Sequence, residues 1–237
     1  MKVEILYPAI ANLYGEAVEM RYIEKCLPDA EIIKTELNDE PAFVRNDVDF
    51  IFMGPLTESG QEKAISRLNP YVDRINELID RGTVFLVIGN ALEVFGDYIE
   101  NEDGSKIKAL GIFPTYAKRK MMNRYNSLFL GEFENMKIVG FKAQFSHSYG
   151  GNENEGLFKV IRGAGLNPDA KYEGVKRNNF FGTYLLGPLL ILNPEFTKYI
   201  LSLLGVENAA LPCEKDITLA YGQRLKEFEK KETVYLG

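Results

Sequence analysis

The sequence has one histidine, two cysteines and no tryptophan, so it offers few side chains for soft-metal coordination or covalent catalysis. The two thiols, Cys26 and Cys213, lie far apart in the chain. The first residues have the pattern of a strand rather than of a signal peptide, which predicts a cytoplasmic protein with reduced thiols. These features predict neither a metal site nor a bound cofactor.

Excess positive charge and long apolar runs are also missing. The chain carries 28 Lys and Arg residues against 34 Asp and Glu residues, a net charge of −6 at pH 7. This balance argues against a broad cationic surface for nucleic acid. The longest apolar runs, 83–88 and 184–192, are far shorter than the roughly 20 residues of a membrane span. We therefore expect neither nucleic-acid binding nor a membrane span.

What the sequence does contain is an alternation of short apolar runs with helical patterns. With 46% hydrophobic residues the chain can bury a substantial core. The alternation predicts an α/β fold of flavodoxin-like type, a mostly parallel sheet with helices on both faces. Strands are expected at 2–7, 31–37, 48–53 and 83–88, and helices at 16–26 and 60–79, the latter kinked or divided at Pro70.

The second half has a different pattern. Short strand-like segments separated by turns fill 111–150, which predicts antiparallel hairpins added to the parallel sheet. Strands at 157–161 and 179–186 and a helix at 194–204 complete a predicted domain over residues 1–204. Residues 205–237 form a predicted tail that contains an amphipathic helix at 216–231.

Four stretches resemble one known family in their order and spacing. They are Leu6-Tyr7-Pro8 with Asn12-Leu13-Tyr14-Gly15-Glu16, residues 49–54 followed by Gln61, residues 84–96, and residues 182–190 with Asn193-Pro194. Together they resemble the cobyric-acid-synthase-like branch of the class I glutamine amidotransferases. The resemblance is greatest to the glutaminase subunits of lipid II isoglutaminyl synthases.

The resemblance implies a particular chemistry. In this family a cysteine on a strained turn, at a helix N-terminus after a central strand, attacks the amide of glutamine. A histidine from a distant strand takes the proton, and exposed backbone N–H groups stabilise the oxyanion. The ammonia passes to a partner synthetase, which for this branch implies a Mur-ligase-like protein acting on cell-wall precursors.

This chain departs from the family pattern at three places. Gly89 stands at the nucleophile position and Leu186 at the base position. In the glycine-rich loop the family's second glycine is replaced by Pro55, which has no N–H to offer an oxyanion. The sequence therefore predicts that the thioester mechanism is missing.

The remaining candidates are weighed between structural and functional roles. We predict a vestigial pocket at the strand ends, and there Asn90 can simply cap a helix, its commonest role in such a place. Cys26, Cys213 and His147 are interpreted as structural, and the basic run from Lys118 to Arg124 as a solvated face or else a phosphate or partner contact. The predicted pocket residues are Asn12, Gly54, Pro55, Asn90, Glu93 and Tyr184.

Three functions remain open from sequence. The first is an amidotransferase-like partner or regulatory subunit of a Mur-ligase-like synthetase, without glutaminase activity. The second is a small-molecule binding module on the same fold. The third is an active enzyme with relocated chemistry, in which Glu93 or His147 acts as a base.

Overall fold

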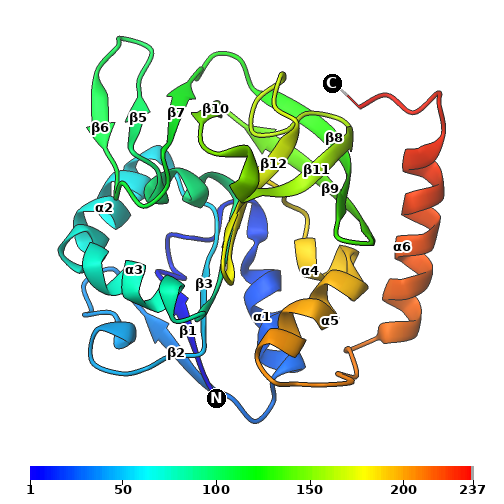
Figure 1. Ribbon diagram of the computed structural model, residues 1–237, viewed down its shortest axis with the longest axis horizontal. Helices are drawn as coiled ribbons and strands as arrows, with labels where there is room; N and C mark the ends of the chain where they lie inside the picture. Colours follow the sequence, from blue (N-terminus) through cyan, green and yellow to red (C-terminus); the bar gives the residue numbers. More distant parts are fainter. Residues whose placement is uncertain (236–237) are drawn as a thin grey trace.

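The computed structural model describes residues 1–235 and contains two sheets. The larger has nine strands in the order β2-β1-β3-β4-β13-β12-β11-β8-β9 (Figure 1). Its first five strands are parallel, and the other four extend it in antiparallel fashion. The strands are β1 (Lys2–Leu6), β2 (Glu31–Thr35), β3 (Phe50–Met53), β4 (Val84–Ile88), β8 (Tyr125–Phe133), β9 (Met136–Gln144), β11 (Gly156–Arg162), β12 (Tyr172–Arg177) and β13 (Phe180–Thr183).

Helices cover both faces of the parallel strands, as the alternating sequence pattern predicts. Side chains such as Ile51 and Met53 pack with α2 and α3 on one face, whereas Phe50 and Phe52 pack with α1 and α5 on the other. Strands buried on both faces need continuous apolar runs, which explains why these segments show no polar alternation. The helices are α1 (Ala17–Cys26), α2 (Glu58–Leu68), α3 (Val72–Asp80), α4 (Leu189–Leu192), α5 (Pro194–Leu203) and α6 (Glu214–Glu229).

Pro70 divides the predicted long helix as expected. A short 3₁₀ segment, η3 (Asn69–Tyr71), separates α2 from α3, because proline cannot donate the backbone hydrogen bond that would continue α2. The other short 3₁₀ segments are η1 (Leu13–Gly15), η2 (Ala42–Val44), η4 (Gly89–Phe95) and η5 (Glu153–Glu155).

A second, four-stranded sheet differs from the sequence expectation. The prediction placed every hairpin of the middle region on the large sheet, and this is right only for β8 and β9. Four short strands form a separate sheet in the order β10-β7-β5-β6. They are β5 (Tyr98–Glu100), β6 (Lys106–Lys108), β7 (Thr115–Arg119) and β10 (Ser146–Gly150).

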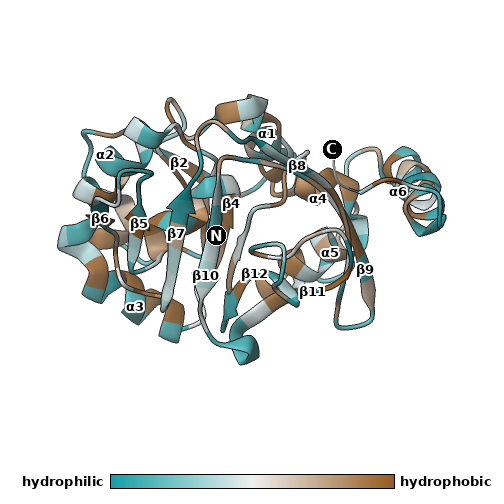
Figure 2. Ribbon diagram, turned by 90° about the horizontal axis from the view of Figure 1, so that it is seen from above, coloured by the Kyte–Doolittle hydropathy of each residue, from teal (hydrophilic) through white to brown (hydrophobic). Residues whose placement is uncertain are grey.

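The terminal helix α6 lies at the periphery of the molecule, against β8 and β9 (Figure 2). Arg162 on β11 donates hydrogen bonds to the carbonyl oxygens of Phe228 and Thr233, which fixes the segment that follows α6. None of the helices in residues 1–235 combines the length and the hydrophobicity needed to cross a membrane.

Candidate functional site

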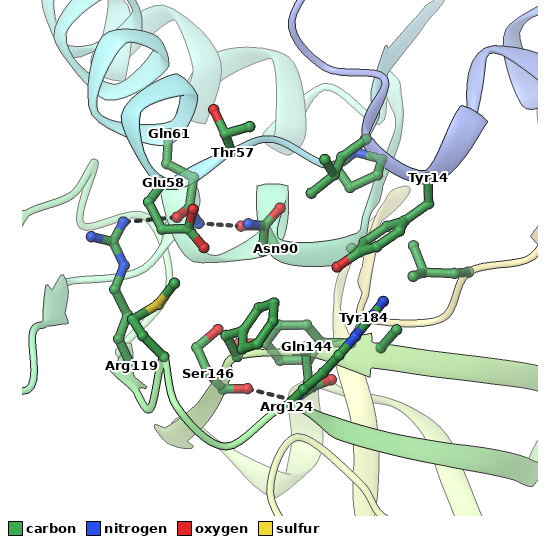
Figure 3. A pocket seen from close by; sticks show the side chains of 17 residues that line it. Tyr14, Thr57, Glu58, Gln61, Asn90, Arg119, Arg124, Gln144, Ser146 and Tyr184 are labelled. Atoms are coloured by element: carbon green, nitrogen blue, oxygen red, sulfur yellow. Dashed lines mark hydrogen bonds between the residues drawn. The ribbon is translucent and has the colours of Figure 1, made fainter.

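The carboxyl ends of β1, β3, β4 and β13 meet at one edge of the large sheet, where α/β proteins generally place ligand sites. The loops that leave these strands line a cavity of about 310 Å³. Its opposite wall comes from the β7–β8 loop and the end of β9, so that strands of both sheets face the same space (Figure 3). Lining residues include Tyr14, Pro55, Gly89, Asn90, Arg119, Arg124, Gln144, Ser146, Tyr184 and Leu186.

Gly89 follows β4 directly and adopts a φ of +64°, a region that L-residues rarely occupy. A Cβ atom built on Gly89 would lie 2.6 Å from the Cβ of Pro55 and 3.3 Å from Cδ2 of Leu186. The first distance is shorter than real Cβ contacts allow. The three positions at which the sequence departs from the family pattern, though remote from one another in the chain, therefore meet in one packed turn.

Asn90 does not cap a helix, so the structural role predicted for it is wrong. Asn90 is the second residue of the 3₁₀ segment η4, which has no side-chain cap. Instead, Oδ1 of Asn90 accepts a hydrogen bond from the N–H of Leu56, and Nδ2 donates to the carbonyl oxygen of Leu56, each at 2.8 Å. The side chain thereby fixes the loop after β3. The backbone N–H of Leu56, the first one after Pro55, is already engaged in a hydrogen bond.

Glu93 lies beneath the cavity in a buried hydrogen-bond network. Its carboxylate accepts hydrogen bonds from the hydroxyls of Ser146 and Tyr184 and from Nε2 of Gln61, the last at 2.9 Å. Burial raises the pKa of Glu93, and these hydrogen bonds and the charge of Arg119 partly offset that rise. The network joins α2, η4, β10 and the segment after β13, and it fixes the floor of the cavity.

Arg119 corrects the interpretation of the basic run as a solvated face. Its side chain turns inward from β7, is almost fully buried, and donates to Oε1 of Gln61 and Oδ1 of Asn101, both at 2.9 Å. Nε of Arg119 and Oε1 of Gln144 are buried and have no hydrogen-bond partner among the described residues. Both residues line the cavity, but these two atoms are themselves buried, so they are unsatisfied polar groups behind its wall.

Arg124 supplies a cation at the mouth of the cavity. Its guanidinium lies 5.4 Å from the ring centroid of Tyr14 and 5.8 Å from that of Phe145. Within residues 1–235 it makes no ion pair, and the two aromatic rings hold it in place by cation–π attraction. Tyr14 itself has a φ of +65°, a strained conformation of the kind that is often found at functional turns.

The other reactive side chains have structural surroundings. His147 lies on β10, with Nδ1 3.2 Å from Nε2 of Gln144 and its ring packed edge-on against Tyr125. Burial, assisted by Lys142 and Lys120, lowers the pKa of His147 to about 4, so the imidazole is neutral at pH 7. Cys26 is buried, as interpreted, and Cys213 is exposed at the start of α6.

Two buried carboxyl groups support the segment that contains Leu186. Oε1 of Glu16 accepts the N–H of Gly187 at 3.1 Å, and Oε1 of Glu19 accepts the N–H of Leu190 at 2.8 Å. Their Oε2 atoms have no partner in the described part of the chain. Burial raises the pKa of both groups, that of Glu19 to about 8.

A buried lysine lies behind the same segment. Nζ of Lys142 donates to the carbonyl oxygen of Gly165 and lies 3.9 Å from Oε1 of Glu173. Burial lowers the pKa of Lys142 to about 8 and raises that of Glu173, although the attraction between the two charges opposes both changes. Glu173 also accepts the backbone N–H of Tyr184 at 2.8 Å, so this pair fixes the chain where it leaves β13.

Of the six residues predicted to form the pocket, Pro55, Asn90 and Tyr184 line the cavity. Asn12 lies beside it, where Oδ1 accepts the N–H of Ala17 at 2.6 Å. Gly54 does not line the cavity. It lets the backbone of Ala11 approach closely, because a Cβ at position 54 would lie 2.3 Å from the carbonyl oxygen of Ala11. Sequence reasoning missed Arg124, Gln144 and Ser146 as wall residues because they come from another part of the chain.

Among residues 1–235, no group of three or more His, Cys, Asp or Glu is placed to hold a metal ion.

The order of strands, the turn after β4 and the cavity at the strand ends define a class I amidotransferase fold. Residues 2–193 match the model of the CobB/CobQ-like glutamine amidotransferase domain, and the chain belongs to this family. In fold, it is similar to a solved glutamine amidotransferase, with a TM-score of 0.57 at 12% identity over 86% of this chain and 99% of that one. A chain of PurLQS from Thermotoga maritima gives a TM-score of 0.55 at 14% identity, covering 94% and 98% of the two chains.

Two related proteins show which members of this family the chain resembles. The chain is 28% identical over 206 residues to the lipid II isoglutaminyl synthase (glutamine-hydrolyzing) subunit GatD of Staphylococcus aureus, covering 86% of this chain and 83% of that protein. It is 26% identical over 198 residues to the GatD subunit of Streptococcus pneumoniae, covering 79% and 74%. The relatives are therefore subunits of a synthase that hydrolyses glutamine.

Proposed function

We propose that this chain is an amidotransferase-like subunit that has lost glutamine hydrolysis and that acts as a partner or regulatory subunit of a Mur-ligase-like synthetase. The observation that carries the proposal is the contact between Gly89, Pro55 and Leu186. The site has no thiol at the turn after β4, and the space that a side chain would need there is filled. The relatives' description as synthase subunits supports the partner.

The proposed loss of glutamine hydrolysis follows because the groups needed for the thioester mechanism are missing. Glycine provides no nucleophile at position 89, and leucine at position 186 accepts no proton. Pro55 has no N–H, and the N–H of Leu56 already donates to Asn90, so the loop after β3 offers no free donor at these positions for an oxyanion. A subunit of this kind can organise the partner, regulate it, or shield the site at which the partner uses free ammonia.

Relocated catalysis has weaker support. The hydroxyl of Ser146 donates a hydrogen bond to Glu93, which resembles a nucleophile with its base. However, Tyr184 donates to the same carboxylate oxygen and Gln61 to the other, so both oxygens of Glu93 are already engaged inside the buried network. His147 has its Nδ1 engaged with Gln144. The network supports a structural role for these groups.

The purified chain is expected to release no glutamate from glutamine, either alone or with the Mur-ligase-like proteins of the same organism. The reason is the missing thiol, so an electrophilic glutamine analogue should also leave the mass of the protein unchanged. Release of glutamate that depends on the partner would contradict the proposal. In that case His147→Ala and the pair Cys26→Ser with Cys213→Ser would identify the relocated group.

A second candidate, a small-ligand binding module, is favoured by the cavity at the strand ends and by the cation at its mouth. Arg124 lines the cavity and forms no ion pair within residues 1–235. A ligand with a carboxylate would pair with this guanidinium. Pro55 and Leu186 line the cavity, whereas Leu92 is not among its lining residues and packs near Gly182.

Glutamine and glutamate are suitable probes for this second function. At a concentration of about 100 times Kd, a ligand that binds only the folded chain adds about 2.7 kcal/mol of stability. For a domain of this size we expect a rise in Tm of about 5–10 °C, which Arg124→Ala should abolish. Arg21→Ala, which changes an exposed arginine on α1, is the matched control. An equal rise in both variants, or no rise with either probe, would remove this candidate.

A further inference from the structure

The β7–β8 loop, residues 120–124, carries the most exposed large apolar side chain of the described residues. Met122 is 88% exposed, and its neighbour Met121 lines the mouth of the cavity. Tyr14, 45% exposed, lies across the mouth and is joined to the loop through Arg124. Two of these exposed side chains, Tyr14 and Met121, line the cavity, and Met122 follows Met121 directly. Such clustering commonly marks an interaction surface.

Two cations that the chain does not neutralise flank these methionines in the sequence. Lys120 and Arg124 form no ion pair within residues 1–235, whereas Lys118, two residues before Lys120 on β7, lies 3.4 Å from Glu100. The whole chain carries a net charge of −6, so uncompensated cations at this place stand out against its acidic character. A complementary surface would be apolar at its centre and acidic at its edge.

Backbone hydrogen bonds support the loop at its start and across its turn. Lys120 donates its N–H to the carbonyl oxygen of Phe145 at 2.6 Å, and Asn123 donates to that of Lys120 at 3.0 Å, which places Met121 and Met122 at the corner of a turn. Strand β7 is braced by a row of three stacked tyrosines, Tyr98, Tyr116 and Tyr149, with centroids 5.0 and 5.8 Å apart. A surface ordered in advance loses less entropy on binding.

The expected binding affinities favour a protein over a membrane as the partner of this surface. Two cations and one buried methionine would give the chain only a millimolar affinity for an anionic bilayer. The net negative charge of the chain opposes even this binding. A protein recess that encloses Met122 and pairs both cations gains far more from the same groups, because methionine, tyrosine and arginine are typical of interface centres.

We propose that the β7–β8 loop and Tyr14 form the docking surface for the synthetase subunit, which presents an apolar recess edged by Asp and Glu residues to Met122 and Lys120. This inference rests on the proposed function. It places the partner directly over the mouth of the cavity, so that docking and occupancy of the cavity are coupled.

The test measures the affinity of the full-length chain for the Mur-ligase-like proteins of the same organism, by calorimetry at low and at high salt. Met122→Asp and Lys120→Glu are each expected to raise Kd at least tenfold, and Lys120→Glu should reduce the salt dependence. Both leave Arg124 and the cavity intact. Leu219→Asp and Lys226→Glu, which make the same changes on exposed positions of α6, are the matched controls and should leave Kd unchanged.

The outcomes separate the two proposals. If the complex forms and all four variants bind alike, the docking surface is wrong while the subunit role stands. If the wild-type chain binds none of these proteins, both proposals fail. Co-sedimentation of the wild-type chain with vesicles containing phosphatidylglycerol, lost in Met122→Asp, together with unchanged protein binding, would assign the surface to a membrane and overturn the inference.

Discussion

Replacing Gly89 by cysteine, the change that would restore a nucleophile, is expected to destabilise the protein by roughly 2–5 kcal/mol rather than activate it. Two effects add. A side chain at the φ of +64° costs about 1–2 kcal/mol. Its Cβ would also lie 2.6 Å from the Cβ of Pro55, and relieving such overpacking typically costs about 1–3 kcal/mol. Urea unfolding monitored by circular dichroism measures the loss.

Gly104 provides the control that separates these two effects. It has a φ of +82° at the tip of the β5–β6 hairpin, and nothing lies within 4 Å of the position where its Cβ would be. Gly104→Cys should therefore show the backbone cost alone. Combining Gly89→Cys with Pro55→Gly should recover the packing part of the loss. If Gly89→Cys and Gly104→Cys unfold at the same urea concentration, the packed turn does not exist as described.

The second large effect is a dependence of stability on pH that arises from Glu19. Its pKa is raised from 4.5 to about 8 because the carboxyl group is buried, and the N–H of Leu190 offsets this only in part. The folded chain therefore holds a proton that the unfolded chain releases near pH 4.5. The contribution of this group to stability is complete below that pH and is lost as the pH rises through about 8, by up to roughly 5 kcal/mol.

Glu19→Gln should remove most of this loss. At about pH 5 the variant and the wild type are expected to have similar free energies of unfolding, with the variant slightly lower, because its amide carries two unpaired donors and the protonated carboxyl one. Above about pH 8 the variant should be the more stable by a few kcal/mol, and the slope that remains comes from the other buried carboxyl groups, among them Glu16, Glu93 and Glu173. Glu31→Gln, at an exposed position on β2, is the control. A wild type whose stability is flat from pH 5 to 9 would contradict the buried, protonated state of Glu19.

The parallel half of the fold could be predicted from sequence because its strands are apolar throughout and are separated by clear helical patterns. Pro70 marked the break between α2 and α3 for the same local reason. The second sheet could not be predicted in this way. Its strands are three to five residues long, and tyrosine and lysine on their outer face hide the alternation that usually identifies a strand.

The site was predictable on one side only. The loops after β3 and β4 follow recognisable strands, so Pro55 and Gly89 could be placed at the sheet edge from sequence. The opposite wall depends on where the β7–β8 loop and the end of β9 return, and no local pattern gives that position. The burial of Arg119 could not be predicted from sequence either, because its hydrogen-bond partners Gln61 and Asn101 come from other parts of the chain.

The packed turn after β4 also constrains how this sequence can change over time. With Pro55 in place, a mutation of Gly89 to any other residue meets a steric barrier before it confers a benefit. Regaining a side chain there requires an earlier change at position 55, which by itself opens a void and offers nothing to selection. We therefore expect the effects of changes at the two positions to depend on each other, so that a side chain at position 89 is tolerated better after position 55 has changed.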